Sequence, residues 1–402
     1  MNVELLAPAG NFEKMKTALY FGADAVYLGG KHFSLRTFAD NFTSEELKKA
    51  VSLAHSLQKK VYTATNIYAR NADFPMLKDY FIELEKIGVD GVIVSDPGVV
   101  YAVKRFAPKL CIHLSTQANT TNKFAVQFWK EQGISRVILA RELPIKEIAE
   151  IHEAVPDIEL EAFVHGAMCI SYSGRCLLSD YLDGRASNRG ACVQSCRWKY
   201  EVRALNATNG KSEWLPIEED GKGTYIFNSK DLNMLSRLEE MAGAGIRSFK
   251  IEGRMKSGYY LATVINAYRR AIDGGALSLS EKELLAVAHR DYTQGYASGE
   301  NSKTVNYNDS QSKGEYTYVA DVIGYEKGQA LVQMRNRFKK GERLEVLSPS
   351  EQFGKSFTVE SAIDSKGNET DDCKLVQKIY KINCPYPLAK GDYLRRKNEG
   401  KI

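Results

Sequence analysis

Four cysteines clustered in the middle of the chain are the strongest chemical signal in this 402-residue sequence. Cys169, Cys176, Cys192 and Cys196 fall within 28 residues, separated by 6, 15 and 3 residues, among polar and glycine-rich neighbours. Thiolates are soft ligands, and four of them from one loop are what zinc or an iron–sulfur cluster requires. The intervals match neither ferredoxins nor zinc ribbons, so they predict a metal centre without choosing the metal. Buried, unrelated thiols are the plainer interpretation.

Charged residues near the ends of apolar runs form a second group of candidates. Lys250, Glu252 and Arg254 alternate along one run, so on a strand their side chains would share a face. The two cations could hold a dianionic acid or a phosphate, and Glu252 could move a proton. Arg36 and Arg141 follow two other apolar runs and are similar substrate-binding candidates. A solvated run of charges is the alternative.

Polar residues earlier in the chain could also take part. His113, Gln117 and Asn119 could hydrogen-bond the edge of a base, although satisfied structural polar groups are the plainer interpretation. A cysteine peptidase would need a lone activated thiolate beside a histidine, and His165, four residues before Cys169, is a candidate for that histidine. The carboxylate of Glu161 could orient the cysteine-rich loop, or it could be an internal salt-bridge partner.

Repeated pairs of a short β-rich run and an amphipathic helical pattern must position these residues. Such βα units predict a parallel sheet, and eight of them in about 250 residues match a (β/α)8 TIM-type barrel. A doubly wound sheet has similar spacing, but no G-x-G-x-x-G follows the first run. In a barrel, the functional groups lie just after each strand. We expect strands at 3–6, 25–28, 60–64, 91–94, 111–114, 136–139, 159–164 and 248–251.

The chain divides into a large domain and a small one. We expect the barrel over 1–300, with a cysteine-rich loop at 165–230, and a polar linker at 301–315. Residues 316–402 alternate in short pieces, which predicts a small antiparallel β-barrel. Its run of Arg335, Arg337, Lys339 and Lys340 around an aromatic residue predicts RNA binding, with a solubilising hairpin as the alternative.

Composition and charge exclude several classes of protein. Hydrophobic residues make up 44% and charged residues 26%, which is the usage of a folded protein rather than a disordered one. No apolar run approaches the roughly 18 to 20 residues of a membrane span, and the first residues lack the basic-then-apolar pattern of a signal peptide. An odd count of seven cysteines disfavours a disulfide framework. We therefore expect a cytoplasmic protein without a membrane partner.

Three stretches resemble the collagenase-like peptidase family thirty-two, of unknown catalytic type. The stretch EAFVHGAMCISYSGRCLLS, from Glu161 to Ser179, is similar to the family signature position for position. The opening ELLAPAGN with GADAVYLGG behind it, and the late FKIEGR, look like the same family. The resemblance therefore covers the whole first domain.

The resemblance implies a function that the residues alone do not give. The better understood branches of the family look like oxygen-independent hydroxylases that carry a 4Fe-4S cluster on four cysteines, which implies that role for the four clustered cysteines here. This length and the small C-terminal barrel look most like the branch that hydroxylates the wobble uridine of tRNA to 5-hydroxyuridine, with prephenate as co-substrate. A paralogous family member is a further partner that the resemblance suggests, and no DNA partner is expected.

Two other functions stay open at this point. The family name implies a collagenase-like peptidase, yet the chain has no H-E-x-x-H and no G-x-S-x-G motif. Four clustered thiols also favour ligation over nucleophilic attack. The third possibility is a protein without catalytic activity that binds RNA or carries a cluster.

Overall fold

A computed structural model describes residues 1–35, 40–169, 171–198, 203–205, 212–214, 229–299 and 314–398 of the chain. These residues form two compact units. The first takes in the described residues within 1–15, 24–255 and 290–312, and the second takes in those within 16–23, 256–289 and 313–402. Within the described part, no helix has the length and apolarity that crossing a membrane would take.

Eight parallel strands close into a barrel in the first unit, which confirms the predicted fold class. Neighbours pair in chain order from β1 to β7, and β11 closes the sheet by pairing with both β1 and β7. Most of these strands are short apolar runs with consecutive buried residues, as expected of a parallel sheet covered by helices. The barrel strands are β1 (Glu4–Pro8), β2 (Ala25–Leu28), β3 (Lys60–Ala64), β4 (Gly91–Val94), β5 (Ile112–Leu114), β6 (Arg136–Ile138), β7 (Glu159–Ala167) and β11 (Ile246–Ile251).

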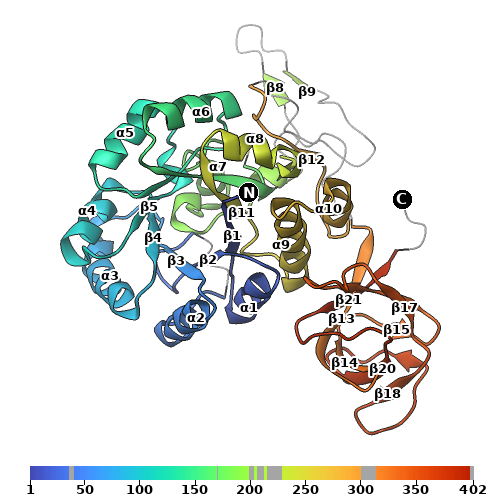
Figure 1. Cartoon of the computed structure of the whole chain (residues 1–402). Helices are drawn as coiled ribbons and strands as arrows, with labels where there is room; N and C mark the ends of the chain where they lie inside the picture. Colours follow the sequence, from blue (N-terminus) through green and yellow to red (C-terminus); the bar gives the residue numbers. More distant parts are fainter. Residues whose placement is uncertain are drawn as a thin grey trace. The chain divides into compact units, whose positions relative to one another are not determined.

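Helices connect the strands, and Figure 1 shows α2 to α6 arranged around the outside of the barrel. Helix α2 begins with a capping box, in which Thr43 Oγ1 accepts from the Glu46 amide and Glu46 accepts from the Thr43 amide. The helices are α1 (Phe12–Tyr20), α2 (Ser44–Ser56), α3 (Phe74–Ile87), α4 (Pro97–Phe106), α5 (Lys123–Glu131), α6 (Ile145–Ala154) and α8 (Leu238–Gly243).

The inside of the barrel is packed with side chains, as in other TIM-type barrels. Six buried side chains form an apolar cluster there, and Phe163 of β7 packs against it. The interior is therefore a solid core, and any reaction site must lie at an end of the strands. The buried members of the cluster are Leu6, Ala25, Tyr27, Tyr62, Ile93 and Ile138.

The cysteine-rich insertion follows β7, as predicted. Its described part holds a short helix, two 3-10 turns and a small hairpin. Beyond it, β10 pairs antiparallel with the end of β7, and β12 pairs with β10. These elements are α7 (Leu178–Asp183), η3 (Ser187–Arg189), η4 (Ser195–Arg197), β8 (Arg203–Leu205), β9 (Ser212–Trp214), β10 (Asp231–Asn233) and β12 (Tyr292–Thr293).

An antiparallel sheet makes up most of the second unit, in agreement with the predicted small β domain. Its strand order is β17-β16-β21-β13-β14-β20-β18, and β15 pairs with β19. The predicted linker lies outside the described residues except for Gly314 and Glu315. The strands are β13 (Tyr316–Glu326), β14 (Gln329–Met334), β15 (Phe338–Lys339), β16 (Arg343–Leu347), β17 (Ser356–Thr358), β18 (Ala362–Asp364), β19 (Asp372–Cys373), β20 (Ile379–Asn383) and β21 (Tyr393–Lys397).

Two helices, α9 (Gly258–Ile272) and α10 (Leu277–Leu284), belong to the same unit as this sheet. The ring of Tyr259 stacks on Tyr318 with 5.0 Å between centroids. Arg395 donates to both carboxylate oxygens of Glu283, at 2.6 and 2.7 Å, and both side chains are buried. Buried contacts therefore join the helices before the predicted linker to the strands after it.

Candidate active site

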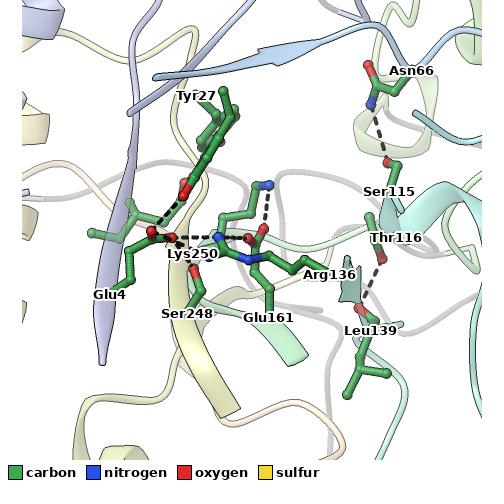
Figure 2. A network of polar contacts seen from close by, with 12 residues as sticks. Glu4, Tyr27, Asn66, Ser115, Thr116, Arg136, Leu139, Glu161, Ser248 and Lys250 are labelled. Carbon is green, nitrogen blue, oxygen red and sulfur yellow. Dashed lines mark hydrogen bonds and ion pairs between the residues drawn. The ribbon is translucent and has the colours of Figure 1, made fainter. Parts of the chain in front are cut away.

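The carboxyl ends of the barrel strands, which we call the mouth, carry a network of polar side chains. Asn66, two residues past β3, donates from Nδ2 to Gln117 Oε1 at 2.8 Å. It also contacts Ser115 Oγ at 3.5 Å, and Figure 2 shows this pair. Asn119 ends a 3-10 turn with a left-handed φ of 54°. The structure thus brings the predicted residues Gln117 and Asn119 to the mouth.

The cysteine-rich loop contacts this network directly. Tyr68 Oη donates to the carbonyl oxygen of Gly174 at 2.7 Å and lies 3.3 Å from that of Gln117. Arg189 forms a bidentate pair with Asp73, at 2.9 and 3.2 Å, and its hydrogen bonds lower the pKa of Asp73. The loop is therefore held against the segments that follow β3 and β5. Sequence reasoning missed Tyr68 and Arg189, because pairing between distant loops leaves no local signal.

Cys169 follows β7 by two residues, so the first cysteine of the cluster starts at the mouth. Cys169 is exposed, while Cys176, Cys192 and Cys196 are half-buried, and none of the four is in a disulfide. The protein around Cys169 still desolvates its thiol and raises its pKa, and the thiols of Cys176 and Cys192 raise it further.

In the described residues, no group of three or more His, Cys, Asp or Glu side chains is arranged as metal ligands. The donor set has the right chemistry for a soft metal centre, and the thiols of Cys176 and Cys192 lie close enough to Cys169 to raise the pKa of its thiol. Ligation by the four cysteines stays a prediction.

Arg141 and Glu142 lie beyond the end of β6, at the mouth. Arg141 Nη1 donates to the carbonyl oxygen of Ala167 at 2.7 Å, and its guanidinium lies 3.8 Å from the ring centroid of Phe163. Burial lowers the pKa of Arg141 and raises that of Glu142. The Nε of Arg141 and the Oε2 of Glu142 are buried, and neither has a hydrogen-bond partner in the described part.

The sequence pointed to Arg141 but not to Glu142. The sequence shows that Glu142 also follows a predicted strand, but it does not show that the Glu142 carboxyl group is buried. Glu252 also belongs to this region. Its backbone amide donates to the carbonyl oxygen of His165 at 2.9 Å, and its carboxylate opposes the effect of burial on the pKa of Arg141. The ring of His165 lies 5.5 Å from that of Tyr292.

Arg254 holds the loop after β2 in place. Its Nη1 donates to Ser34 Oγ at 2.6 Å and to the carbonyl oxygen of Leu35 at 3.1 Å, and Nη2 donates to Asn41. The guanidinium is thus occupied by its own chain. Arg36, the neighbouring candidate, lies outside the described residues.

Glu161 and Lys250 form an ion pair inside the barrel. Lys250 Nζ donates to Glu161 Oε1 at 2.7 Å, and Arg136 Nη1 reaches Glu161 Oε2 at 3.1 Å (Figure 2). Arg136 also binds Glu4, at the start of β1, at 2.6 Å. Burial lowers the pKa of Lys250 despite its partner. This placement differs from the expectation that Lys250 would share the mouth with Arg254, and it matches the internal salt-bridge role considered for Glu161.

His113 also lies inside the barrel rather than at the mouth. Its ring packs against Tyr62 with 4.6 Å between centroids. Burial, helped by the nearby cations of Arg136 and Lys250, holds the pKa of His113 well below its usual range. A neutral, buried imidazole among these charges is part of the core.

The basic run of the second unit is partly neutralised. Arg335 binds Asp321 at 2.6 Å, and Arg337 binds Asp372 through two hydrogen bonds of 2.8 and 2.6 Å. Lys340 lies 3.6 Å from Asp371, and Lys339 is on β15. RNA binding by these four cations stays a prediction, with the two lysines less firmly paired than the arginines.

Comparison with known proteins identifies relatives over nearly the whole chain. Residues 10–307 match the model of peptidase family U32, and residues 314–395 match that of the peptidase family U32 C-terminal domain. The tRNA hydroxylation protein P1 of Bacillus subtilis (strain 168) is 41% identical over 405 residues, covering 98% of this chain and 94% of that protein.

Of two further relatives, one is also named as a tRNA hydroxylation protein and the other is named as a collagenase. The tRNA hydroxylation protein P of Escherichia coli (strain K12) is 38% identical over 413 residues, covering 90% of each chain. A protein of Porphyromonas gingivalis (strain ATCC BAA-308 / W83) named collagenase is 31% identical over 322 residues, covering 75% of each chain.

Proposed function

Because this chain belongs to peptidase family U32, with both the main and the C-terminal domain of that family, we propose that it is an enzyme that hydroxylates tRNA. The reaction proposed is oxygen-independent hydroxylation at C5 of the wobble uridine, giving 5-hydroxyuridine, with prephenate as co-substrate. The observation that carries the proposal is the identity of 41% and 38% to two tRNA hydroxylation proteins across both domains. The proposed substrate places the activity in the cytoplasm.

Cys169, Cys176, Cys192 and Cys196 would hold the 4Fe-4S cluster of this proposal. When bound, such a cluster supplies an iron centre able to transfer electrons or polarise an oxygen atom beside the mouth. The supporting observations are the soft donor set and the contact of the loop with the mouth through Gly174. Iron and sulfide should therefore be found in anaerobically purified protein. One zinc in a colourless protein would replace the cluster by a structural metal site.

The residues of the mouth would bind and orient the target base. Asn66 and Gln117 fix each other, and the Asn66 amide links the segments after β3 and β5. Arg141, held by Ala167 and Phe163, places a fixed cation there. Tyr68 keeps the cysteine-rich loop close, so the base would sit between this loop and the strand ends.

The proposal is tested by nucleoside analysis of total tRNA from the source organism with this gene deleted. Loss of 5-hydroxyuridine and its derivatives, restored by the gene on a plasmid, is the expected result. Unchanged modification would contradict the proposal. Protein that binds tRNA while leaving its nucleosides unchanged would instead indicate a binding or accessory role.

A peptidase is the second candidate, favoured by the Porphyromonas relative named collagenase. Purified protein would then cleave denatured collagen or a peptide library, and a single Ser or Cys substitution outside the cluster would abolish the cleavage. We expect no turnover in this assay.

A further inference from the structure

Two adjacent side chains at the mouth each bury a polar atom without a partner. The atoms are Nε of Arg141, a donor, and Oε2 of Glu142, an acceptor, and neither is satisfied within the described residues. Buried polar atoms are nearly always hydrogen-bonded, because leaving one unpaired costs about 1 to 3 kcal/mol. A bound ligand that offers one acceptor and one donor would satisfy both.

The surroundings fix how these two atoms are presented. Arg141 Nη1 donates to the Ala167 carbonyl oxygen and the guanidinium contacts the Phe163 ring, while the buried Nε has no partner among the described residues. Glu142 lies close enough to Tyr296 to raise the pKa of that phenol, after burial, and Tyr172 of the cysteine-rich loop adds to the effect. Glu142 and Tyr172 of the cysteine-rich loop therefore both lie near Tyr296.

Two more buried polar atoms that lack a partner among the described residues follow other strands of the barrel. Thr65 Oγ1, after β3, and Asn119 Oδ1, after β5, are also buried without a partner in the described part. A simple anion would be attracted by Arg141 but repelled by the Glu142 carboxylate beside it. A neutral ring with alternating donors and acceptors fits this set better than a phosphate or a carboxylate does.

We propose that Arg141 and Glu142 read the Watson–Crick edge of the target uracil, a role that rests on the tRNA hydroxylation proposed above. Arg141 Nε donates to O4, and the Glu142 carboxylate accepts the N3 proton. Cytosine reverses both features, since its N3 is an acceptor and its position 4 carries an amino donor. The pair therefore selects uracil over cytosine. Reading the N3 and O4 atoms also leaves C5, the atom to be hydroxylated, free for reaction.

Binding to anticodon stem-loop RNA tests this assignment with the full chain. The probes differ only at the wobble position, which is uridine, cytidine or 3-methyluridine, the last lacking the N3 proton. We expect the wild type to bind the uridine RNA about tenfold more tightly than the other two, the effect of one hydrogen bond to a charged group. Glu142→Gln should bind the uridine and cytidine RNAs with a smaller difference than the wild type does, because an amide can accept or donate at N3 while Arg141 still favours O4.

Two controls keep the result interpretable. Glu147→Gln, an exposed carboxylate in the first turn of α6, should keep the wild-type preference. Glu142→Asp retains the acceptor and should restore part of the preference that Glu142→Gln loses.

A parallel assay in cells uses tRNA with uridine or cytidine at the wobble position and measures the hydroxylated nucleosides. The wild type should modify uridine, and Glu142→Gln should narrow the difference between the two bases by about tenfold or more. If Glu142→Gln discriminates as the wild type does, the inference is overturned while tRNA hydroxylation stands. If the wild type neither binds nor modifies the uridine tRNA, the proposed function fails, and the inference fails with it.

Discussion

Buried charged residues in the first unit fall into two kinds. Glu161 and Lys250 satisfy each other inside the barrel, and Arg136 continues the chain of ion pairs to Glu4. Arg141, at the mouth, instead has a buried Nε that finds no hydrogen-bond partner in the part of the chain that the structure describes. The ion pairs contribute to the stability of the fold, whereas the Nε of Arg141 is available to the base in the inference above.

Glu161→Gln should destabilise the barrel strongly. Lys250 and Arg136 would be left without the carboxylate that binds both, and removing one member of a buried ion pair costs about 3 to 5 kcal/mol. Urea unfolding at pH 7 measures this decrease in unfolding free energy. Glu45→Gln, which removes the exposed pair with Lys48, is the control and should change the free energy by less than about 1 kcal/mol. Equal decreases for the two variants would contradict the structural role of Glu161.

The preference for uridine should increase with pH in weakly acidic solution. Burial raises the pKa of Glu142, so its carboxyl group keeps a proton at pH values where an exposed glutamate has lost it. The protonated group donates, which suits N3 of cytosine, and the ionised group accepts, which suits uracil. Affinities for the uridine and cytidine stem-loops should therefore diverge as the pH rises through this pKa. A ratio that does not change with pH would contradict this role.

Part of the candidate site could be predicted from single residues. Arg141, Gln117 and Asn119 were identified because each follows a predicted strand, and in a barrel such positions meet at the mouth. Lys250 was placed at the mouth in error, because alternation along a strand gives the face of a side chain but not its depth in the barrel. Glu142 was missed because burial of a carboxyl group depends on distant segments.

Docking of the cysteine-rich loop depends on one glycine. Gly174 has a φ of +77°, and a Cβ there would lie 2.4 Å from Tyr68 Oη and 2.5 Å from the Gln117 carbonyl oxygen. The close approach of the loop to the mouth therefore requires glycine at this position.

Gly174→Ala should detach the loop while leaving the barrel folded. Faster proteolysis within 171–198, with unchanged far-ultraviolet circular dichroism, is the expected result, together with loss of tRNA hydroxylation. Gly184→Ala is a matched control, because its φ of +64° gives similar backbone strain but no atom of the described residues lies within 4 Å of the new Cβ. The same protease sensitivity in both variants would show that strain, rather than contact with the mouth, is responsible.

The barrel elements could be predicted more fully than those of the second unit. Repeated apolar runs between amphipathic helices gave all eight barrel strands, because a strand buried on both faces is apolar throughout. In the second unit, the separate pair β15 and β19 has two residues in each strand, too few for alternation to appear. Such short strands are defined by their pairing with each other and not by a pattern along the chain.

At the scale of the whole molecule, the second unit joins segments that are far apart in the sequence. Arg395 of β21 binds Glu283 of α10 across 112 positions, and both are buried. No local pattern indicates such a pair, so the polar linker at 301–315 could be predicted from the sequence but this ion pair could not. Truncation of the C-terminal strands should therefore also destabilise helices α9 and α10, which belong to the same unit.

Replacing Arg335, Arg337, Lys339 and Lys340 by alanine should weaken tRNA binding. The dependence of log affinity on log salt should flatten by about 0.7 to 0.9 for each phosphate group that is no longer neutralised. Titration with tRNA at several salt concentrations provides the measurement. Because carboxylates hold the two arginines, we expect the Lys339→Ala/Lys340→Ala double variant to account for most of the change.

Lys327 and Lys366 provide the matched control, since both lie on exposed turns of the same unit. Their double alanine variant should leave affinity and salt dependence near those of the wild type. Unchanged binding by the quadruple variant would show that its basic run is a solvated surface.

Expression of the chain in another bacterium tests whether it hydroxylates tRNA. The chain is expressed in a bacterial strain that lacks its own tRNA hydroxylation genes, and tRNA hydrolysates are analysed by mass spectrometry. We expect 5-hydroxyuridine or its derivatives to appear with the wild type and to be absent with Cys176→Ser at equal protein levels. Unmodified tRNA in cells that contain the folded wild-type chain would contradict the account.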